Sequence, residues 1–178
     1  GDWSSDVCSS DLRETAGVVV FSKRASERAA YHALFREQRV QKYYLAVAGV
    51  DPSLSFPLVH RSRLGPGRQF FLSQEVPGEP NSLTHVSLVK QVGEMALYGL
   101  QPVSGHRHQL RLHMLSLGLP IVGDQFYPEV LRGPHEEDDF IQCLQLLAYR
   151  IGFTDPITGQ QREWRSQRSL SIRLNDSL

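Results

Sequence analysis

This sequence has little cysteine, no long apolar run and no excess of charge of either sign. Its 178 residues include two cysteines, Cys8 and Cys143, too few for a disulfide framework or a four-ligand zinc site, so a reducing cytoplasm is expected. No apolar run approaches the length of a membrane span, and there is no signal-peptide pattern, so we expect no membrane association. Because 19 Lys and Arg balance 19 Asp and Glu, any nucleic acid would have to be bound by local basic clusters.

What is present has the composition of one globular domain. Hydrophobic residues make up 40% of the chain and charged residues 21%, which suits a single domain with its own core. The first twelve residues, GDWSSDVCSSDL, differ: they repeat Ser-Ser-Asp, follow neither helical nor strand periodicity, and resemble a translated sequencing adapter. We predict that residues 1–12 are non-native and that residues 13–178 form the domain. The alternative is a genuine serine-rich tail.

Apolar periodicity predicts an α+β fold with a largely antiparallel mixed sheet and flanking helices. A helix capped by Ser26 and ending near residue 38 would turn Ala29, Ala33 and Leu34 inward. Residues 129–139 are expected to form a solvated acidic loop. Strands are expected at residues 18–21, 42–50, 83–92, 95–103 and around 163–164, with a turn at 155–159, while residues 144–151 suit either a helix or a strand.

A Pro- and Gly-rich excursion covers residues 52–81. It contains Arg61, Arg63 and Arg68, followed by Phe70 and Phe71. Basic residues interleaved with aromatic ones suit phosphate contact combined with base stacking, which predicts RNA contacts here. A solvated hairpin whose phenylalanines pack onto the sheet explains the same pattern, and the sequence leaves both possibilities open.

The most informative stretch runs from residue 103 to residue 128. Leu110, Met114 and Leu117 recur at helical spacing, and Gly118 stands where a left-handed helix end is expected. Polar residues flank this apolar row; among them, His108 and Arg111 lie one turn apart and can point into a cleft at the start of the helix. Because backbone N–H groups there favour negative charge, the cleft suits an anion.

Histidines in this stretch raise the alternative of a metal site built from His106, His108 and His113. Alternating histidines in an extended segment can bind metal, but the first two would diverge once the helix begins. No cysteine or carboxylate completes the set at a usual spacing. We therefore expect no metal.

Three ordered motifs between residue 13 and about residue 155 resemble those of the RluA-type pseudouridine synthases. The clearest is Gly105, the run His108-Gln109-Leu110-Arg111-Leu112-His113, and the tail Gly118-x-Pro120-Ile121-x-Gly123-Asp124-x-x-Tyr127. Lys42-Tyr43-Tyr44-Leu45-Ala46-Val47 is similar to the family's Lys-x-Tyr-x-Ala strand. Arg13-Glu14-Thr15-Ala16-Gly17 resembles the second half of its His-Arg-Leu-Asp-Arg-x-Thr-Ser-Gly motif.

The resemblance implies an RNA-modifying isomerase that converts uridines of ribosomal or transfer RNA to pseudouridine, as a monomer and without metal or cofactor. Arg111 would then pair with the catalytic aspartate, and Tyr44 would pack on the base and take its C5 proton. Without the motif, Arg111 could be a surface residue and Tyr44 a core tyrosine. The other residues that the resemblance points towards RNA are Arg13, Thr15, Lys42, Arg107, His108 and Gln109, each with a structural or solvated role as its alternative.

One motif is broken at its most important position. Leu12 stands where the family has its catalytic aspartate, and Asp11 comes one place early. In an extended segment a shift of one residue turns the side chain to the opposite face, so Asp11 is a weak substitute. We expect the chain as given to be inactive, truncated within this motif and, with an open sheet edge, marginally stable. The alternative function is that of a non-catalytic RNA-binding domain with the same fold.

Overall fold

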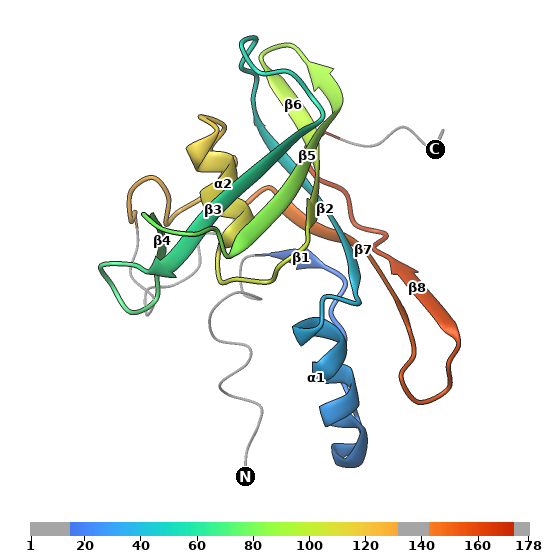
Figure 1. The fold of residues 1–178 in the computed structure, drawn as a ribbon. Coiled ribbons are helices and arrows are strands. Elements are labelled where there is room, and N and C mark those ends of the chain that lie inside the picture. The colour runs from blue at the N-terminus through green and yellow to red at the C-terminus, as the bar shows by residue number, and fades with distance from the viewer. Residues whose placement is uncertain (1–14, 132–142, 173–178) are drawn as a thin grey trace.

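The structure, a computed structural model, describes residues 15–131 and 143–172. One eight-stranded sheet dominates it, in the order β1-β7-β2-β6-β5-β3-β4, with β8 paired to β7 (Figure 1). The elements are β1 (Ala16–Gly17), the 3-10 helix η1 (Ala25–Glu27), α1 (Arg28–Arg36), β2 (Gln41–Gly49), β3 (Leu58–Pro66), β4 (Ser73–Val76), β5 (Ser82–Val92), β6 (Met95–Pro102), α2 (Gln109–Ser116), β7 (Leu146–Thr154) and β8 (Gln161–Arg165).

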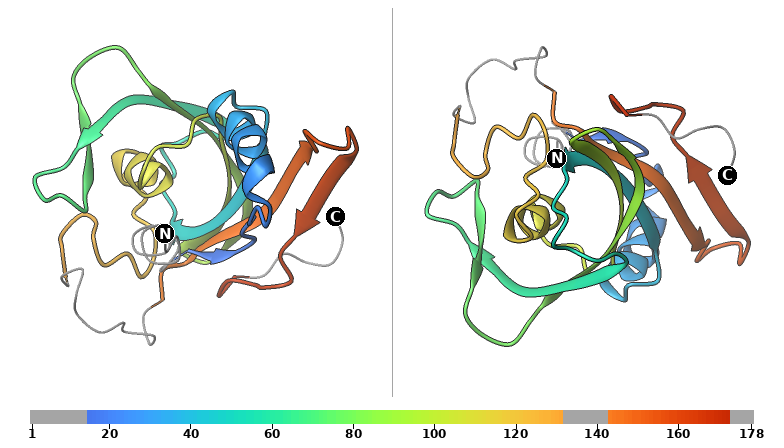
Figure 2. Two further views of the ribbon diagram at one scale, coloured as in Figure 1. Left: turned by 90° about the horizontal axis from the view of Figure 1, so that it is seen from below. Right: turned by 90° about the horizontal axis from the view of Figure 1, so that it is seen from above.

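The sheet is antiparallel apart from the short β1, which runs parallel to β7. It curves around α2, while α1 lies outside the curve beside the β7–β8 hairpin (Figure 2). The expected α+β class and the predicted strands at 42–50, 83–92 and 95–103 are confirmed as β2, β5 and β6. Residues 144–151, which suited either a helix or a strand, form most of β7 because their ladder bonds to β2 extend the sheet.

Helix α2 fills the concave side of the sheet. Leu110 and Met114 are buried against β2 and β6, and Leu117 packs at the edge of the same cluster, as their spacing predicted. The left-handed Gly118 (φ 74°) ends the helix, and the Leu119 N–H donates to the Met114 carbonyl at 2.9 Å. Every residue from 109 to 114 is buried, so the helix has no solvated stripe for its polar side chains. Those side chains must find partners inside the protein.

Helix α1 is shorter than predicted. Leu34 is buried as expected, in a cluster with Val40 and Phe153, but Ala29 is exposed. The prediction of Ser26 as the cap was wrong, because the chain enters the helix through the 3-10 turn η1 and no side chain caps either start. The helix ends at residue 36, and Gln38 turns the chain with a positive φ of 56°.

The predicted strand at residues 18–21 is wrong. β1 consists of two residues, and the last ladder bond runs from the Val18 N–H to the Ala148 carbonyl at 2.9 Å. Gly17, with φ at 118°, lies so close to β7 that a Cβ would sit 2.2 Å from the Ala148 oxygen. The chain then turns away, leaving Phe21 71% exposed. β-Branched residues favour strands, but neighbouring contacts decide whether one forms.

The excursion at residues 52–81 contains two strands whose positions the sequence did not predict. β3 and β4 form an antiparallel hairpin, and on β3 exposed residues alternate with less exposed ones. Phe71 is buried and its ring lies 5.5 Å from that of Phe126, as expected for a hairpin packed on the core. Phe70 is 81% exposed, so that explanation holds for only one of the two phenylalanines.

The C-terminal hairpin follows its turn chemistry. Asp155 accepts hydrogen bonds from the N–H groups of Ile157 and Thr158, and Gly159 takes a positive φ of 71°. The last predicted strand is β8, whose five residues are all exposed. Of the predicted acidic loop at 129–139, residues 132–139 lie outside the described residues. In the described ranges, no helix combines the length and the apolar character that a membrane span requires.

Candidate active site

A cavity of about 280 Å³ lies where β1, β2 and β7 meet the start of α2. Val18, Val19 and Phe35 form an apolar part of its wall. Its lining also includes six of the predicted site residues, Thr15, Lys42, Tyr44, His108, Gln109 and Arg111. These residues come from three separate motifs of the sequence, and the fold brings them to one place. Arg13, Leu12 and Asp11 lie outside the described residues.

Arg111 is buried although it is charged, because Asp124 pairs with it. The Arg111 Nε–H donates to one Asp124 carboxylate oxygen at 2.8 Å, and Nη2 donates to the other. The side chains are 5% and 3% exposed. The guanidinium also lies over the ring of Phe126, 4.8 Å from its centroid. Asp124 further accepts the N–H groups of Phe126 and Tyr127, so it also braces the turn after α2.

Lys42 projects from β2 into the cavity. Its Nζ donates to the Ser104 carbonyl at 2.7 Å, and burial lowers the pKa of its ammonium group. One of the three ammonium hydrogens thus holds the loop before α2. The alternative of a merely solvated lysine does not fit this position, and a positive charge is fixed at the cavity.

Tyr44 lies two residues further along β2, in the wall of the same cavity. Burial raises the pKa of its hydroxyl, so the neutral phenol is favoured at neutral pH. Within the described residues the hydroxyl has no hydrogen-bond partner. Its side chain is therefore part of the cavity wall, and the described part of the protein makes no use of its hydroxyl.

Gln109 is fully engaged by the protein. Its Oε1 accepts the Ser104 hydroxyl at 2.9 Å and the His106 N–H at 3.1 Å. Its Nε2 donates to the Leu83 carbonyl and to the Thr84 hydroxyl, both at 3.0 Å. Because all four hydrogen-bonding positions of the amide are used, Gln109 supports the cavity and has no free amide group for RNA.

His108 links the start of α2 to β4. It adopts a left-handed conformation (φ 55°) and is 6% exposed. Its Nδ1 lies 2.8 Å from the Tyr127 hydroxyl, which also accepts the Ser73 N–H and donates to the Ser73 carbonyl. Since the hydroxyl hydrogen is already used, Nδ1 must donate. This is a structural role, one of the alternatives for this residue.

The histidines of the suggested metal site have separate partners. His106 Nε2 lies 2.9 Å from the Asn81 carbonyl, whereas His108 bonds to Tyr127. His113 is fully buried, with Nδ1 2.8 Å from the Thr84 hydroxyl. The Ser82 hydroxyl gives its hydrogen to the Ser62 carbonyl at 2.7 Å, so it accepts from His113 Nε2. Nδ1 in turn accepts from the Thr84 hydroxyl. The His113 proton therefore sits on Nε2, which lies 3.0 Å from the Ser82 hydroxyl and 3.1 Å from that of Ser62.

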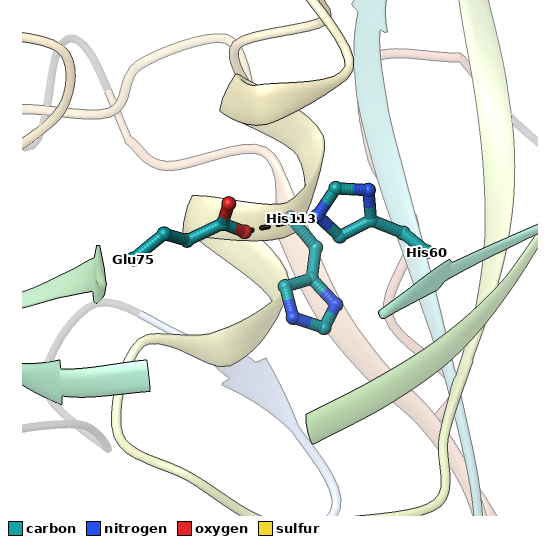
Figure 3. A group of neighbouring side chains, drawn as sticks. All are labelled: His60, Glu75 and His113. Atoms are coloured by element: carbon teal, nitrogen blue, oxygen red, sulfur yellow. Dashed lines mark hydrogen bonds and ion pairs between the residues drawn. The ribbon is translucent and has the colours of Figure 1, made fainter. Parts of the chain in front are cut away.

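A different trio of possible ligands, His60, Glu75 and His113, lies with its ligand atoms within 4.8 Å of one another (Figure 3). His60 Nε2 and Glu75 Oε1 are 2.9 Å apart. Burial works against ionised Glu75, but hydrogen bonds, the largest from His60, outweigh it and lower its pKa. Since both nitrogens of His113 are bonded to hydroxyl groups, a metal would have to displace them. In this structure the trio is held by hydrogen bonds within the protein.

The remaining predicted RNA contacts lie away from the cavity wall. Arg61 and Arg63 occupy the exposed positions of β3, and Arg68 is exposed in the loop that follows. Arg107 donates from Nη1 to the Phe70 carbonyl at 2.9 Å, so it anchors that loop. Sequence reasoning missed Asp124 as the partner of Arg111. The spacing of thirteen residues, across a helix end, gave no local signal.

A family model described as RNA pseudouridylate synthase matches residues 13–116, more than half of the chain. The chain belongs to this family. The "Dual-specificity RNA pseudouridine synthase RluA" of Salmonella typhi is 31% identical over 155 residues, which cover 85% of this chain and 68% of that protein. The "Ribosomal large subunit pseudouridine synthase C" of Buchnera aphidicola subsp. Baizongia pistaciae is 33% identical over 120 residues, 65% of this chain and 37% of that protein.

Solved structures of the family share the fold. "Human RNA Pseudouridylate Synthase Domain Containing 1" superposes with a TM-score of 0.64 at 23% identity, covering 82% of this chain and 62% of that one. The first three curated relatives are longer than the region matched, since the chain spans 37%, 48% and 56% of their lengths. The resemblance inferred from the motifs is thus confirmed at the level of family and fold.

Proposed function

We propose that this chain is the larger part of an RNA pseudouridine synthase domain, which isomerises uridines in ribosomal or transfer RNA. The observation that supports the proposal best is the cavity that gathers six predicted residues from three motifs. The names of the relatives point to ribosomal and dual-specificity RNA substrates. We further propose that the domain acts as a monomer in the cytoplasm, without metal or cofactor.

The reaction breaks the bond from ribose C1′ to N1 of uracil, turns the base and joins C1′ to C5. It needs an ionised carboxylate at the sugar, and Arg111 is the group proposed to hold it so. Asp124 would keep the Arg111 guanidinium in one orientation, since both of its carboxylate oxygens are engaged. Tyr44 would cover the turned base and receive the C5 proton.

Binding of the nucleotide itself would rest on charge at the cavity. The Lys42 ammonium and the first turn of α2 both favour an anion, which in this substrate is a phosphate. The target nucleotide would have to leave its stack, because ribose C1′ is otherwise inaccessible. Arg61, Arg63, Arg68 and Arg107, and Arg13 and Thr15 near the broken motif, complete the proposed RNA contacts.

Leu12 favours a second candidate function. With leucine at the position of the family aspartate, the chain would bind RNA without reacting. A repaired chain separates the two functions: Ser9→His, Ser10→Arg, Asp11→Leu and Leu12→Asp restore the family motif before Arg13.

The test is tritium release from RNA labelled at uridine C5. We expect none from the chain as given and measurable release from the repaired chain. The inactive control is the repaired chain with the further change Arg111→Met. If the repaired chain binds RNA but releases no tritium, the catalytic proposal fails and RNA binding alone remains.

A further inference from the structure

Basic side chains are concentrated in two segments of a chain whose formal net charge is zero. Residues 23–39 contain five Lys and Arg and two Glu, and residues 149–168 contain four Arg, one Asp and one Glu. Since the totals are 19 and 19, the rest of the chain carries ten basic and 15 acidic residues. The two segments therefore carry a net positive charge, although the net charge of the whole chain is zero.

The two segments form one surface. α1 lies against the β7–β8 hairpin in both views of Figure 2. The Tyr31 hydroxyl donates to Asp155 at 3.3 Å, and the Tyr31 and Phe153 rings meet edge to face with centroids 6.2 Å apart. We define the α1–β8 basic surface by six residues, Arg24, Arg36, Arg39, Arg150, Arg162 and Arg165.

Acidic residues neutralise this surface only in part. Glu27 pairs with Arg24 at 3.0 Å and Asp155 with Arg162 at 3.8 Å, but each of the other two carboxylates is shared by two arginines. Glu37 is shared by two guanidinium groups, those of Arg36 at 3.6 Å and Arg39 at 2.9 Å. Glu163 on β8 is shared in the same way, by Arg150 at 3.4 Å and Arg165 at 3.0 Å. One carboxylate between two cations leaves a net positive charge at each place. It also holds the arginine side chains in position, which lowers the entropy lost when they bind an anion.

An aromatic ring accompanies these charges. Trp164 on β8 is 44% exposed, although one part of its ring packs on Phe153 with centroids 5.5 Å apart. Arg162 lies on the same face of β8, two residues before it. Together with Arg39 it lines a second hollow, of about 250 Å³. Guanidinium groups beside an exposed ring suit single-stranded nucleic acid, whose phosphates and bases alternate.

The surface also reaches the active-site cavity. Phe35, which precedes Arg36 on α1, lines that cavity. A strand that leaves the cavity over α1 would therefore meet the arginines next. An acidic protein would use the charges but gives no reason for the exposed ring.

We propose that the α1–β8 basic surface binds the RNA strand that flanks the target uridine, with phosphates on the arginines and a base against Trp164. This inference rests on the proposed function, since it takes RNA to be the substrate. It adds a second contact region, separate from the β3–β4 arginines predicted from the sequence.

The test is fluorescence anisotropy of the 178-residue chain with a labelled hairpin RNA whose loop contains uridines. Arg36→Glu and Arg165→Glu are compared with Lys90→Glu, which makes the same charge change on β5, outside every proposed contact. Each surface variant should weaken binding about tenfold and reduce the slope of log K against log salt by about 0.7, the value for one phosphate lost from a single strand. Lys90→Glu should bind nearly as the parent does. Melting curves followed by circular dichroism check that each variant is folded. If a glutamate variant is unfolded, Arg36→Gln or Arg165→Gln takes its place.

Equal losses in all three variants would mean that only net charge matters, which overturns the inference. Unchanged binding in the surface variants, with a parent that binds RNA, overturns the inference and leaves the proposed function intact. If the parent binds vesicles containing phosphatidylserine but no RNA, both the inference and the proposed function fail.

The contact with Trp164 has its own test. The sequence has two tryptophans, so a Trp3→Phe chain keeps Trp164 as its one tryptophan. RNA should quench its fluorescence; unchanged fluorescence at saturating RNA would exclude the contact with Trp164.

Discussion

The Arg111 guanidinium and the Asp124 carboxylate form a two-point ion pair that is almost completely removed from solvent. Removing one member of a buried pair leaves a charge without compensation, which costs about 3–5 kcal/mol. Asp124→Asn should therefore lower the free energy of unfolding by about this amount in urea denaturation. Glu94→Gln, an exposed change of the same kind, should stay within about 0.5 kcal/mol of the parent. A similar small effect of Asp124→Asn would contradict the importance of the pair.

The hydroxyl of Tyr44 can be tested apart from its ring. In the repaired chain, Tyr44→Phe should lower tritium release about 100-fold, the low end for a lost proton acceptor, while RNA affinity is kept because the ring remains. Tyr44→Ala should weaken both. If Tyr44→Phe releases tritium at the rate of its parent, the hydroxyl does not accept the C5 proton and only the ring of Tyr44 contributes.

The same hydroxyl predicts a pH dependence. Burial raises its pKa above the ordinary value of 10.0, so the phenolate is scarce at neutral pH and increases with each unit of added pH. If the phenolate takes the C5 proton, tritium release by the repaired chain should rise steadily between neutral pH and pH values near that ordinary value. The Tyr44→Phe chain should show no such rise, and a flat profile in the parent would argue against proton transfer to Tyr44.

His113 should make the fold sensitive to acid. Burial, followed by the nearby His60, lowers the pKa of His113 from 6.5 to about 4. The unfolded chain then binds a proton at a higher pH than the folded chain, so stability falls as pH drops from 6.5 towards 4. This difference in pKa corresponds to about 3 kcal/mol of stability. Urea unfolding at several pH values measures it. His113→Gln should remove most of this slope, and the exposed His85→Gln should leave it unchanged.

Metal removal provides a further test of the proposed chemistry. Dialysis against EDTA should leave tritium release by the repaired chain and the melting temperature of the parent unchanged, since His113 is engaged by hydroxyl groups. A fall in either quantity that added zinc reverses would make the His60, Glu75 and His113 cluster a metal site.

Helix α2 and its neighbours show what local pattern can predict. The apolar row of Leu110, Met114 and Leu117 and the end at Gly118 follow from spacing and turn chemistry alone. β3 was missed because its inward positions include His60 and Ser62, which are polar, so apolar alternation could not reveal it. Their partners come from α2 and β4, far away in the sequence.

The site was predictable in part, through the motifs and not through periodicity. Lys42, Tyr44 and Arg111 meet in the cavity as the resemblance suggested. The roles of Gln109 and His108 depended on distant groups, the Leu83 carbonyl 26 residues away and the Tyr127 hydroxyl 19 residues away. No short pattern encodes such pairings. The strand expected at 18–21 was wrong for the opposite reason. Its β-branched residues favour a strand, but within the described ranges no neighbouring strand bonds to them beyond Val18.

The hydrogen bonds around α2 run from Ser104 through Gln109, Thr84 and His113 to the Ser82 hydroxyl. Thr84 and His113 each accept one hydrogen and donate another, so the direction of one of their bonds depends on that of the next. A change at one position would leave its neighbours with the wrong polarity. We therefore expect these positions to vary together across related sequences, as one inherited unit, even though β5, the loop before α2 and α2 itself contribute to it separately.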